Sequence, residues 1–311
     1  MIKLENVTFR YQTFRKSPGI TGTIRDLVHR EKDEILAVHP TNLNVSDGEM
    51  VGLIGPNGAG KTTLIKMMTG ILPPTTGSLT IGPHTPFKRD FEFLNEIGVL
   101  LGQKSQLSWD LPAIDTLNML SQIYQLSPQS YNDRLEELSQ MLNTSDLLNI
   151  PVRKLSLGQR VRCELMCSLI HSPKYLFLDE PTLGLDILTQ DSIYKFLNHE
   201  NVAHNTTTIV TSHYLQDIEN LSNRLLVITE GTIVYDGSTS DLPVDPSRHQ
   251  KFLVKTFTKE SPDKVFSKTL SPEELNSWMK SGNADNLISI NREGMSLNDF
   301  IRQLYQHGGN N

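Results

Sequence analysis

A short segment from Gly55 to Thr62, GPNGAGKT, combines three glycines with a lysine and a threonine. The glycines let successive backbone N–H groups converge on phosphate oxygens, where a β-carbon would clash. Lys61 supplies a positive charge for the β- and γ-phosphates of a nucleotide, and the hydroxyl of Thr62 is a suitable Mg²⁺ ligand. The predicted phosphate-binding loop comprises Gly55, Pro56, Asn57, Gly58, Ala59, Gly60, Lys61, Thr62 and Thr63.

Two carboxylates follow an apolar run, Tyr175 to Leu178, that is typical of a strand buried on both faces of a parallel sheet. Ligands of such sheets bind at the carboxyl ends of the strands, so Asp179 and Glu180 should reach the phosphate-binding loop. Asp179 is expected to help hold Mg²⁺. Glu180 is placed to orient or deprotonate an attacking water, a role worth roughly 10² to 10⁴ in rate. The alternative is that Glu180 caps a turn before Pro181.

Three further side chains are candidates by their position. His213 follows the strand-like segment 206–212 and could hydrogen-bond a γ-phosphate. Gln103 follows the apolar segment 97–101, and its amide oxygen could reach Mg²⁺ or the attacking water. Tyr11 follows an alternating segment and could stack on a nucleobase. Packing in the core or on the surface is the competing interpretation of the histidine and the tyrosine.

The candidate residues can meet only in a fold in which the carboxyl ends of several strands lie beside the N-terminus of a helix. The apolar run Met50 to Ile54 predicts a buried strand, and Thr63 to Thr69 has helical spacing. The helix would add the positive end of its dipole to the phosphate site. The alternative interpretation of Gly55 to Thr62 is a glycine turn that only joins the strand to the helix and binds no phosphate. An Asn-Lys-x-Asp segment, which small GTPases use to read guanine, does not occur in the chain, so that class is excluded.

A set of motifs occurs in a fixed order along the chain: Gly55 to Thr62, Gln103, LSLGQ at 155 to 159, Leu176 to Glu180, Gly184 to Asp186, and His213. Their order and spacing resemble those of the nucleotide-binding subunits of ABC transporters over about residues 1 to 240. The stretches GQKSQLSWDLP, RKLSLGQR and LFLDEPTLGLD look most like the exporter-type branch, whose permease is a separate chain. The resemblance implies an α/β fold: a P-loop NTPase core of ABC type, with a mostly parallel sheet, an antiparallel β subdomain and a helical subdomain.

In that family a Leu-Ser-x-Gly-Gln turn, the signature turn, closes over the γ-phosphate held by a second subunit. The resemblance assigns this turn to Leu155, Ser156, Leu157, Gly158 and Gln159. It implies that Ser156 and the N–H of Gly158 contact the partner's ATP and that Asp186 lies at the subunit interface. ATP and Mg²⁺ are the expected cofactors, and a second nucleotide-binding subunit, in a homodimer, and an integral membrane permease are the expected partners.

The same resemblance gives catalytic roles to Glu180, His213 and Gln103, and it assigns Mg²⁺ to Thr62, Gln103 and Asp179. The chain departs from the family pattern at Leu157, where glycine is more common. If that position required a positive φ, a leucine would be strained by about 1 kcal/mol or more. Its backbone N–H would still be available to a phosphate.

The chain is expected to divide near the turn-rich segment 236–249. Residues 1–240 form the predicted ATPase domain, with the helical subdomain at about 104–170. Ser127 and Pro128 open a predicted helix in that subdomain. The segment 14–36 is an insert whose middle has helical spacing with basic residues around it. It either docks on the permease or the membrane surface, or packs on its own domain.

Residues 241–311 form a small C-terminal accessory region of predicted α+β structure. KFLVKTF and LISINRE predict strands, and Ser271 opens a helix in capping-box form. A final helix carries Leu297, Phe300, Ile301 and Leu304 on one face. The residues of this region indicate no chemistry of their own, so packing is the favoured interpretation and regulation or dimer support the alternative.

Composition excludes several functional classes. With 29 basic and 35 acidic residues among 311, the net charge of −6 gives no electrostatic reason to expect nucleic acid as a partner. Cys163 and Cys167 lie four apart in a helical stretch, which favours small buried residues over a disulfide or a metal site. The sequence begins without a signal-peptide pattern and has no apolar run of spanning length. A cytoplasmic protein, peripheral on the inner face of the cell membrane, is therefore expected.

Two other functions share most of these motifs. A soluble ABC ATPase acting on ribosomes or DNA is disfavoured because such proteins generally carry two ATPase domains or long coiled-coil insertions, and this sequence shows neither. An ATPase subunit of an importer would use the same chemistry. The transported substrate is determined by the permease and cannot be read from this chain.

Overall fold

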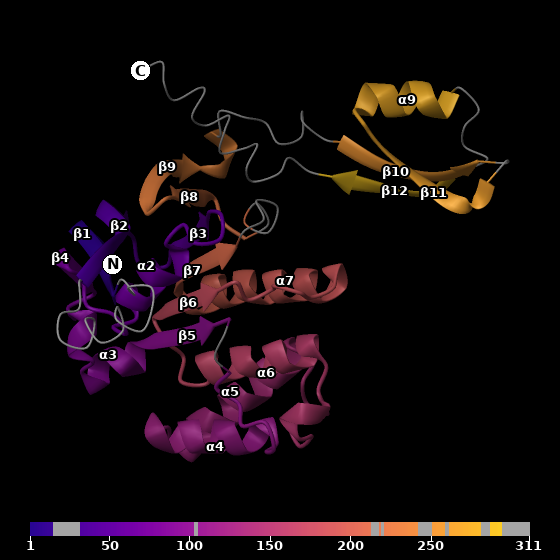
Figure 1. The fold of residues 1–311 in the computed structure, drawn as a ribbon. Helices are drawn as coiled ribbons and strands as arrows, with labels where there is room; N and C mark the ends of the chain where they lie inside the picture. The colour runs from indigo at the N-terminus through magenta and orange to yellow at the C-terminus, as the bar shows by residue number, and fades with distance from the viewer. Residues whose placement is uncertain are drawn as a thin grey trace, which may run out of the picture. The chain divides into compact units, whose positions relative to one another are not determined.

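The computed structural model describes residues 1–14, 32–102, 105–212, 218, 221–241, 251–258, 261–280 and 287–293. The described residues form two compact units, one between Met1 and Gly237 and one from Ser238 onward (Figure 1). No helix among these residues is long and apolar enough to cross a membrane. The centre of the predicted insert and the predicted helix around Leu297 to Leu304 lie outside the described residues.

A six-stranded sheet forms the centre of the first unit, in the order β5-β6-β7-β3-β8-β9. Its strands are β3 (Met50–Ile54), β5 (Ile97–Leu101), β6 (Tyr175–Asp179), β7 (Thr207–Ser212), β8 (Arg224–Thr229) and β9 (Thr232–Ser238). β3 pairs in parallel with β7 and β8, and β6 pairs in parallel with β5 and β7. Every residue of β3 and of β6 is buried, as their continuous apolar runs predict. The parallel order places the carboxyl ends of β3, β6 and β7 at one edge of the sheet.

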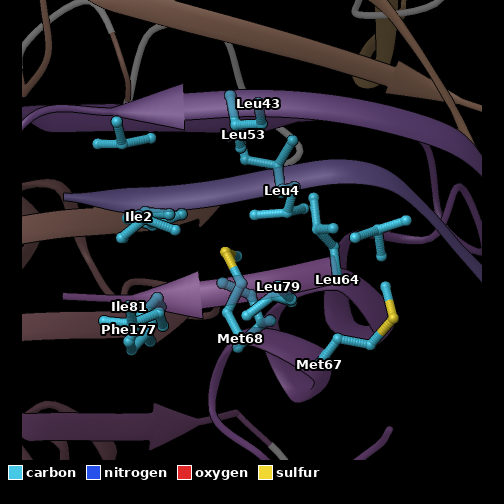
Figure 2. Packing of buried hydrophobic residues seen from close by; sticks show 14 of the residues in the cluster. Ile2, Leu4, Leu43, Leu53, Leu64, Met67, Met68, Leu79, Ile81 and Phe177 are labelled. Carbon is cyan, nitrogen blue, oxygen red and sulfur yellow. The ribbon is translucent and has the colours of Figure 1, made fainter. Parts of the chain in front are cut away.

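A second, three-stranded antiparallel sheet has the order β2-β1-β4, with β1 (Ile2–Phe14) in the middle. Its outer strands are β2 (Lys32–Val45) and β4 (Thr76–Ile81). The helix α2 (Lys61–Met68) contacts strands of both sheets, and most of its residues are buried. Figure 2 shows Met67 and Met68 of this helix packed among Leu4 and Leu79 of the antiparallel sheet. α2 is therefore fixed by one hydrophobic core that includes both sheets.

Three helices lie between β5 and β6 in the sequence and form the predicted helical subdomain. They are α4 (Ala113–Ile123), α5 (Pro128–Met141) and α6 (Leu157–Leu169). Ser127 caps α5, since its Oγ accepts a hydrogen bond of 3.1 Å from the N–H of Ser130, and Pro128 occupies the first turn. Both features confirm the predicted start of this helix. The helix α7 (Ile187–His204) follows β6.

Short elements connect these parts of the first unit. They are the 3₁₀ helices η1 (Pro86–Lys88) and η2 (Val152–Lys154), and the helix α3 (Phe91–Glu96) before β5. A further 3₁₀ helix, η3 (Thr239–Asp241), belongs to the second unit. Cys163 and Cys167 are buried in α6, as predicted. Burial raises the pKa of the Cys163 thiol to about 11, so this thiol is not reactive at neutral pH.

The second unit contains a three-stranded antiparallel sheet in the order β11-β10-β12 and one helix. Its elements are β10 (Lys251–Thr258), β11 (Ser261–Leu270), α9 (Pro272–Lys280) and β12 (Leu287–Glu293). Ser271 and Glu274 exchange two hydrogen bonds, of 2.8 and 3.2 Å, which confirms the predicted capping box. The strand β11 was not predicted, because a proline and several charged residues break its apolar alternation.

Candidate nucleotide site

The glycines of the phosphate-binding loop are required by its backbone. Gly60 has φ of 107° and precedes α2, and a β-carbon there would lie 2.8 Å from the carbonyl oxygen of Ala37. At Gly55 a β-carbon would lie 2.2 Å from the carbonyl oxygen of Ile228. No side chain caps the start of α2, and the first N–H groups of a helix have no partner within the helix. The loop thus presents backbone donors to an anion.

Lys61 is buried directly behind this loop, with 4% of its surface exposed. Its Nζ donates hydrogen bonds to the carbonyl oxygens of Gly55, at 2.7 Å, and Pro56, at 3.3 Å. The same nitrogen lies 3.6 Å from Oε1 of Glu180. Burying an ammonium group costs free energy unless a negatively charged group lies beside it. The position of Lys61 therefore suits a cation that binds an anionic ligand.

The second carboxylate, Asp179, joins the loop to the sheet. Its Oδ2 accepts a hydrogen bond of 2.8 Å from Oγ1 of Thr62, and its Oδ1 accepts one of 2.7 Å from Oγ1 of Thr211. Asp179 and Thr211 are directly paired in the parallel ladder of β6 and β7. The prediction that Asp179 reaches the phosphate-binding loop agrees with this geometry.

Thr211 also holds Glu180, because its Oγ1 accepts a hydrogen bond of 2.9 Å from the backbone N–H of that residue. The sequence reasoning missed this threonine. A hydroxyl near the carboxyl end of a strand that is buried throughout was the available signal. Glu180 itself has φ of 53°, which costs a non-glycine residue about 1 kcal/mol or more. Strain of this kind concentrates at functional sites. In this backbone conformation the carboxylate of Glu180 lies 3.6 Å from Nζ of Lys61.

Tyr11 lies beside the phosphate-binding helix. It is part of β1, which extends past it to Phe14, whereas the sequence placed it after a strand. Its hydroxyl lies 3.1 Å from Oγ1 of Thr63 in α2, and its ring packs edge-on against Phe9 at 4.8 Å. Since 38% of its surface remains exposed, the ring is available for stacking.

The signature turn forms the start of α6. The Oγ of Ser156 accepts from the N–H of Gln159 at 3.3 Å, and the side chain of Gln159 accepts from the N–H of Ser156 at 2.8 Å. Leu157 is the first helical residue, and its φ is negative. The condition under which leucine would be strained here, a positive φ, is therefore not met, because the capping box gives the turn an ordinary helical start. The side chain of Leu157 is 42% exposed.

Asp186 caps α7 in the same manner. Its carboxylate accepts hydrogen bonds from the N–H and the hydroxyl of Thr189, at 3.0 and 2.7 Å. These bonds lower the pKa of Asp186, so the side chain is ionised at neutral pH. A β-carbon at Gly158 would lie 3.0 Å from Cγ2 of Thr189, and one at Gly184 would lie 3.3 Å from Cδ2 of Leu157. The starts of α6 and α7 therefore touch each other.

The remaining site residues of the sequence analysis, Gln103 and His213, lie outside the described residues. Their proposed contacts with Mg²⁺ and with the γ-phosphate stay predictions.

A cavity of about 340 Å³ lies between α3, β5, α4 and α6. Exposed apolar side chains of Ile71, Phe91 and Ile123 line it. Next to them His171 stacks on Tyr124 with the ring centres 3.9 Å apart and donates through Nε2 to the carbonyl oxygen of Ile97 at 2.9 Å. Burial, together with the nearby positive charge of Arg134, lowers the pKa of His171 to about 4, although the bond to Ile97 opposes the shift.

This histidine should make folding stability depend on pH. In the unfolded chain His171 binds a proton below about pH 6.5, whereas in the folded chain it stays neutral down to about pH 4. The unfolded state thus binds more protons in this window, and stability should fall as pH falls from 6.5 to 4, by on the order of 3 kcal/mol from this group. Urea unfolding at several pH values measures the slope. His171→Gln should flatten it, and an equal slope in the variant would contradict the assignment.

A glycine loop with a buried lysine at the start of a helix, bonded to an Asp-Glu pair at the end of a neighbouring strand, defines a P-loop nucleotide hydrolase. Residues 38–183 match the ABC transporter family. The ATP-binding protein NatA of Bacillus subtilis is 31% identical over 223 residues, which cover 71% of this chain and 90% of NatA. The chain belongs to the ATP-binding proteins of ABC transporters, as the motif order predicted, and it binds and hydrolyses ATP.

Other similarities agree with this family. The probable multidrug ATP-binding protein YbhF of Escherichia coli is 30% identical over 249 residues, although the match covers only 43% of that longer protein. The lantibiotic transport protein SrtF of Streptococcus pyogenes is 34% identical over 204 residues, which cover 63% of this chain and 84% of SrtF. A dimeric bacterial ABC transporter cassette superposes with a TM-score of 0.63 at 25% identity, over 76% of this chain and 98% of the cassette. The predicted α/β fold of ABC type is confirmed.

Proposed function

We propose that this chain is the ATPase subunit of an exporter, in which two copies close around two MgATP and drive a separate permease. One observation supports the proposal: the same chain carries a phosphate-binding loop beside two carboxylates and, apart from it, an exposed helix N-terminus that could complete the site of another copy. Lys61, Asp179 and Glu180 form the pocket. The exposed, capped start of α6 at Ser156, beside Asp186, supplies a second helix N-terminus for a phosphate held by another copy.

Thr62 and Asp179 suit Mg²⁺, because the ion takes oxygen ligands and these two oxygens lie 2.8 Å apart at the loop. We assign them, together with Gln103, to hold the ion in company with phosphate oxygens and water. When bound, Mg²⁺ neutralises charge on the β- and γ-phosphates. Lys61 adds its own charge from behind the loop.

In the proposed reaction Glu180 accepts a proton from the water that attacks the γ-phosphorus. His213 hydrogen-bonds the γ-phosphate, and Tyr11 stacks on the nucleobase. Ser156 and the N–H of Gly158 reach the same γ-phosphate from the second copy. Hydrolysis then removes the group that joins the two subunits, and the interface reopens.

We assign permease contact to the cavity beside α4 and to the segment around Trp109, which places the chain on the cytoplasmic face of the membrane. Trp109 and Leu111 are exposed, and the guanidinium of Arg160 lies over the Trp109 ring at 5.8 Å. Exposed aromatic residues with a nearby arginine are typical of interfaces. Relatives named for daunorubicin resistance and for Nod factor export support the direction of transport.

Co-purification tests this proposal. Tagged chain recovered from detergent-solubilised membranes should bring down a multi-helix membrane protein. Trp109→Ser should lower that recovery about tenfold while the free subunit keeps its ATPase activity, because a central aromatic anchor is worth about 1 to 2 kcal/mol or more. Phe87→Ser, which removes another exposed aromatic residue, is the matched control. Recovery with ribosomes in place of a membrane protein would reject the exporter assignment.

A further inference from the structure

A buried arginine joins three helices away from the nucleotide site. Arg134 of α5 is 5% exposed, and its closest acidic partner, Glu200 of α7, is 1% exposed. Together with Glu137, Leu169 and His204 they form a group that we call the Arg134 cluster. No part of this cluster belongs to the pocket or to the signature turn.

The guanidinium of Arg134 uses all three of its nitrogens. Nη2 donates to Oε1 of Glu200, and Nε donates to the carbonyl oxygen of Leu169, the last residue of α6, at 3.3 Å. Nη1 donates to Oε2 of Glu137 at 2.7 Å and lies 3.0 Å from Nε2 of His204. One side chain thereby fixes the end of α6 and the end of α7 to α5.

Stability alone is a poor explanation for this arrangement. Removing a pair of charges from water costs several kcal/mol per ion, and well-packed apolar replacements of a buried pair are often equally or more stable. The other carboxylate oxygen of Glu200 is buried and makes no hydrogen bond among the described residues. The fixed fork of a guanidinium, however, sets the geometry of the groups that it joins.

The two helices held by Arg134 are the ones whose starts form the partner-facing half of the site. α6 begins at the signature turn and α7 begins at Asp186, and these starts touch through Leu157 and Gly184. Since both ends of the two helices are joined, they run parallel, as Figure 1 shows. α6 is roughly 20 Å long at 1.5 Å per residue, so a change of angle at the Arg134 cluster displaces the signature turn.

We infer that Arg134 is a positioning residue for ATP hydrolysis: it keeps the signature turn and Asp186 aligned so that both reach the partner's ATP together. The inference rests on the proposed shared site. Arg134 touches no nucleotide, so its loss should lower the maximal rate of hydrolysis and leave the binding of ATP to the subunit's own pocket unchanged.

The double variant Arg134→Met with Glu200→Met tests this. It removes both charges, so neither is left buried alone, and it should keep the unfolding midpoint of the wild type. We expect kcat to fall at least tenfold, with KM for ATP and the dissociation constant of ATP for the monomer within twofold of the wild type. Arg134→Lys keeps the positive charge but loses the forked geometry of the guanidinium, and its kcat should be less than half of the wild-type value. Lys3→Met with Glu5→Gln, which removes an exposed ion pair in β1, should change none of these values.

A folded double variant with wild-type kcat would overturn the inference. A fall in kcat would also overturn it if a lower unfolding midpoint, and hence a smaller folded fraction, accounted for the whole fall. The same holds if the loss of activity came entirely from a higher KM for ATP. The proposed function fails in a different way: wild-type chain would then lack ATPase activity, or Glu180→Gln would leave it intact. ATPase activity that is lost in Glu180→Gln but kept in the double variant would therefore reject only the role of Arg134 and not the proposed function.

Discussion

Glu180→Gln is expected to lower the rate of ATP hydrolysis by roughly 10² to 10⁴ while ATP still binds. The amide has nearly the same shape as the carboxylate but cannot accept the proton of the attacking water. Thr211 holds the backbone N–H of this residue, which the substitution keeps, so the strand end should keep its conformation. With ATP unhydrolysed, the closed dimer should accumulate. ATPase assays and sedimentation with and without ATP measure both effects.

Glu92→Gln is the matched control for this variant, since Glu92 is exposed in α3. It should leave both the rate and the oligomeric state unchanged. Normal hydrolysis in Glu180→Gln would show that another group accepts the proton.

Ser156→Ala is expected to reduce ATPase activity by about 10² at saturating ATP, which is the usual cost of removing one preorganised donor from a developing charge. The affinity of the monomer for ATP should remain, because the lost contact is with the nucleotide of the other copy. The cap of α6 is lost as well, which should cost about 1 kcal/mol of stability. Steady-state rates at several protein concentrations, together with ATP binding to dilute monomer, separate these effects.

Ser127→Ala provides the comparison, because Ser127 caps α5 by the same type of hydrogen bond. It should lose a similar amount of stability and keep its activity. If the two variants lose activity equally, the effect of Ser156 is one of helix stability and the shared site is not supported.

Local patterns in the sequence predicted much of this structure. The buried strand β3, the glycine turn and α2 follow from apolar runs and residue spacing, and so does the delivery of Asp179 by β6. The starts of α5 and α9 follow from serines whose side chains cap a backbone N–H three residues later. In each case the residues that determine the structure are close together in the chain.

Features that depend on distant segments could not be predicted. The role of Thr211 comes from its pairing with Asp179 across the sheet, which the spacing of residues does not reveal. The Arg134 cluster joins residues from three helices, and nothing near Arg134 in the sequence distinguishes it from an exposed arginine. The helical conformation of Leu157 depends on hydrogen bonds between its neighbours, whereas the question of a positive φ arose from the glycine that is more common in the family.

The position of α2 in a core shared by both sheets has a thermodynamic consequence. A ligand bound at the start of this helix cannot stabilise it without stabilising the strands packed around it, because they unfold together. Nucleotide should therefore slow amide exchange in β1 and β4 as well as in β3, even where the strand has no group near a phosphate. Occupancy of the pocket should in this way be detectable in the antiparallel sheet without any change of shape.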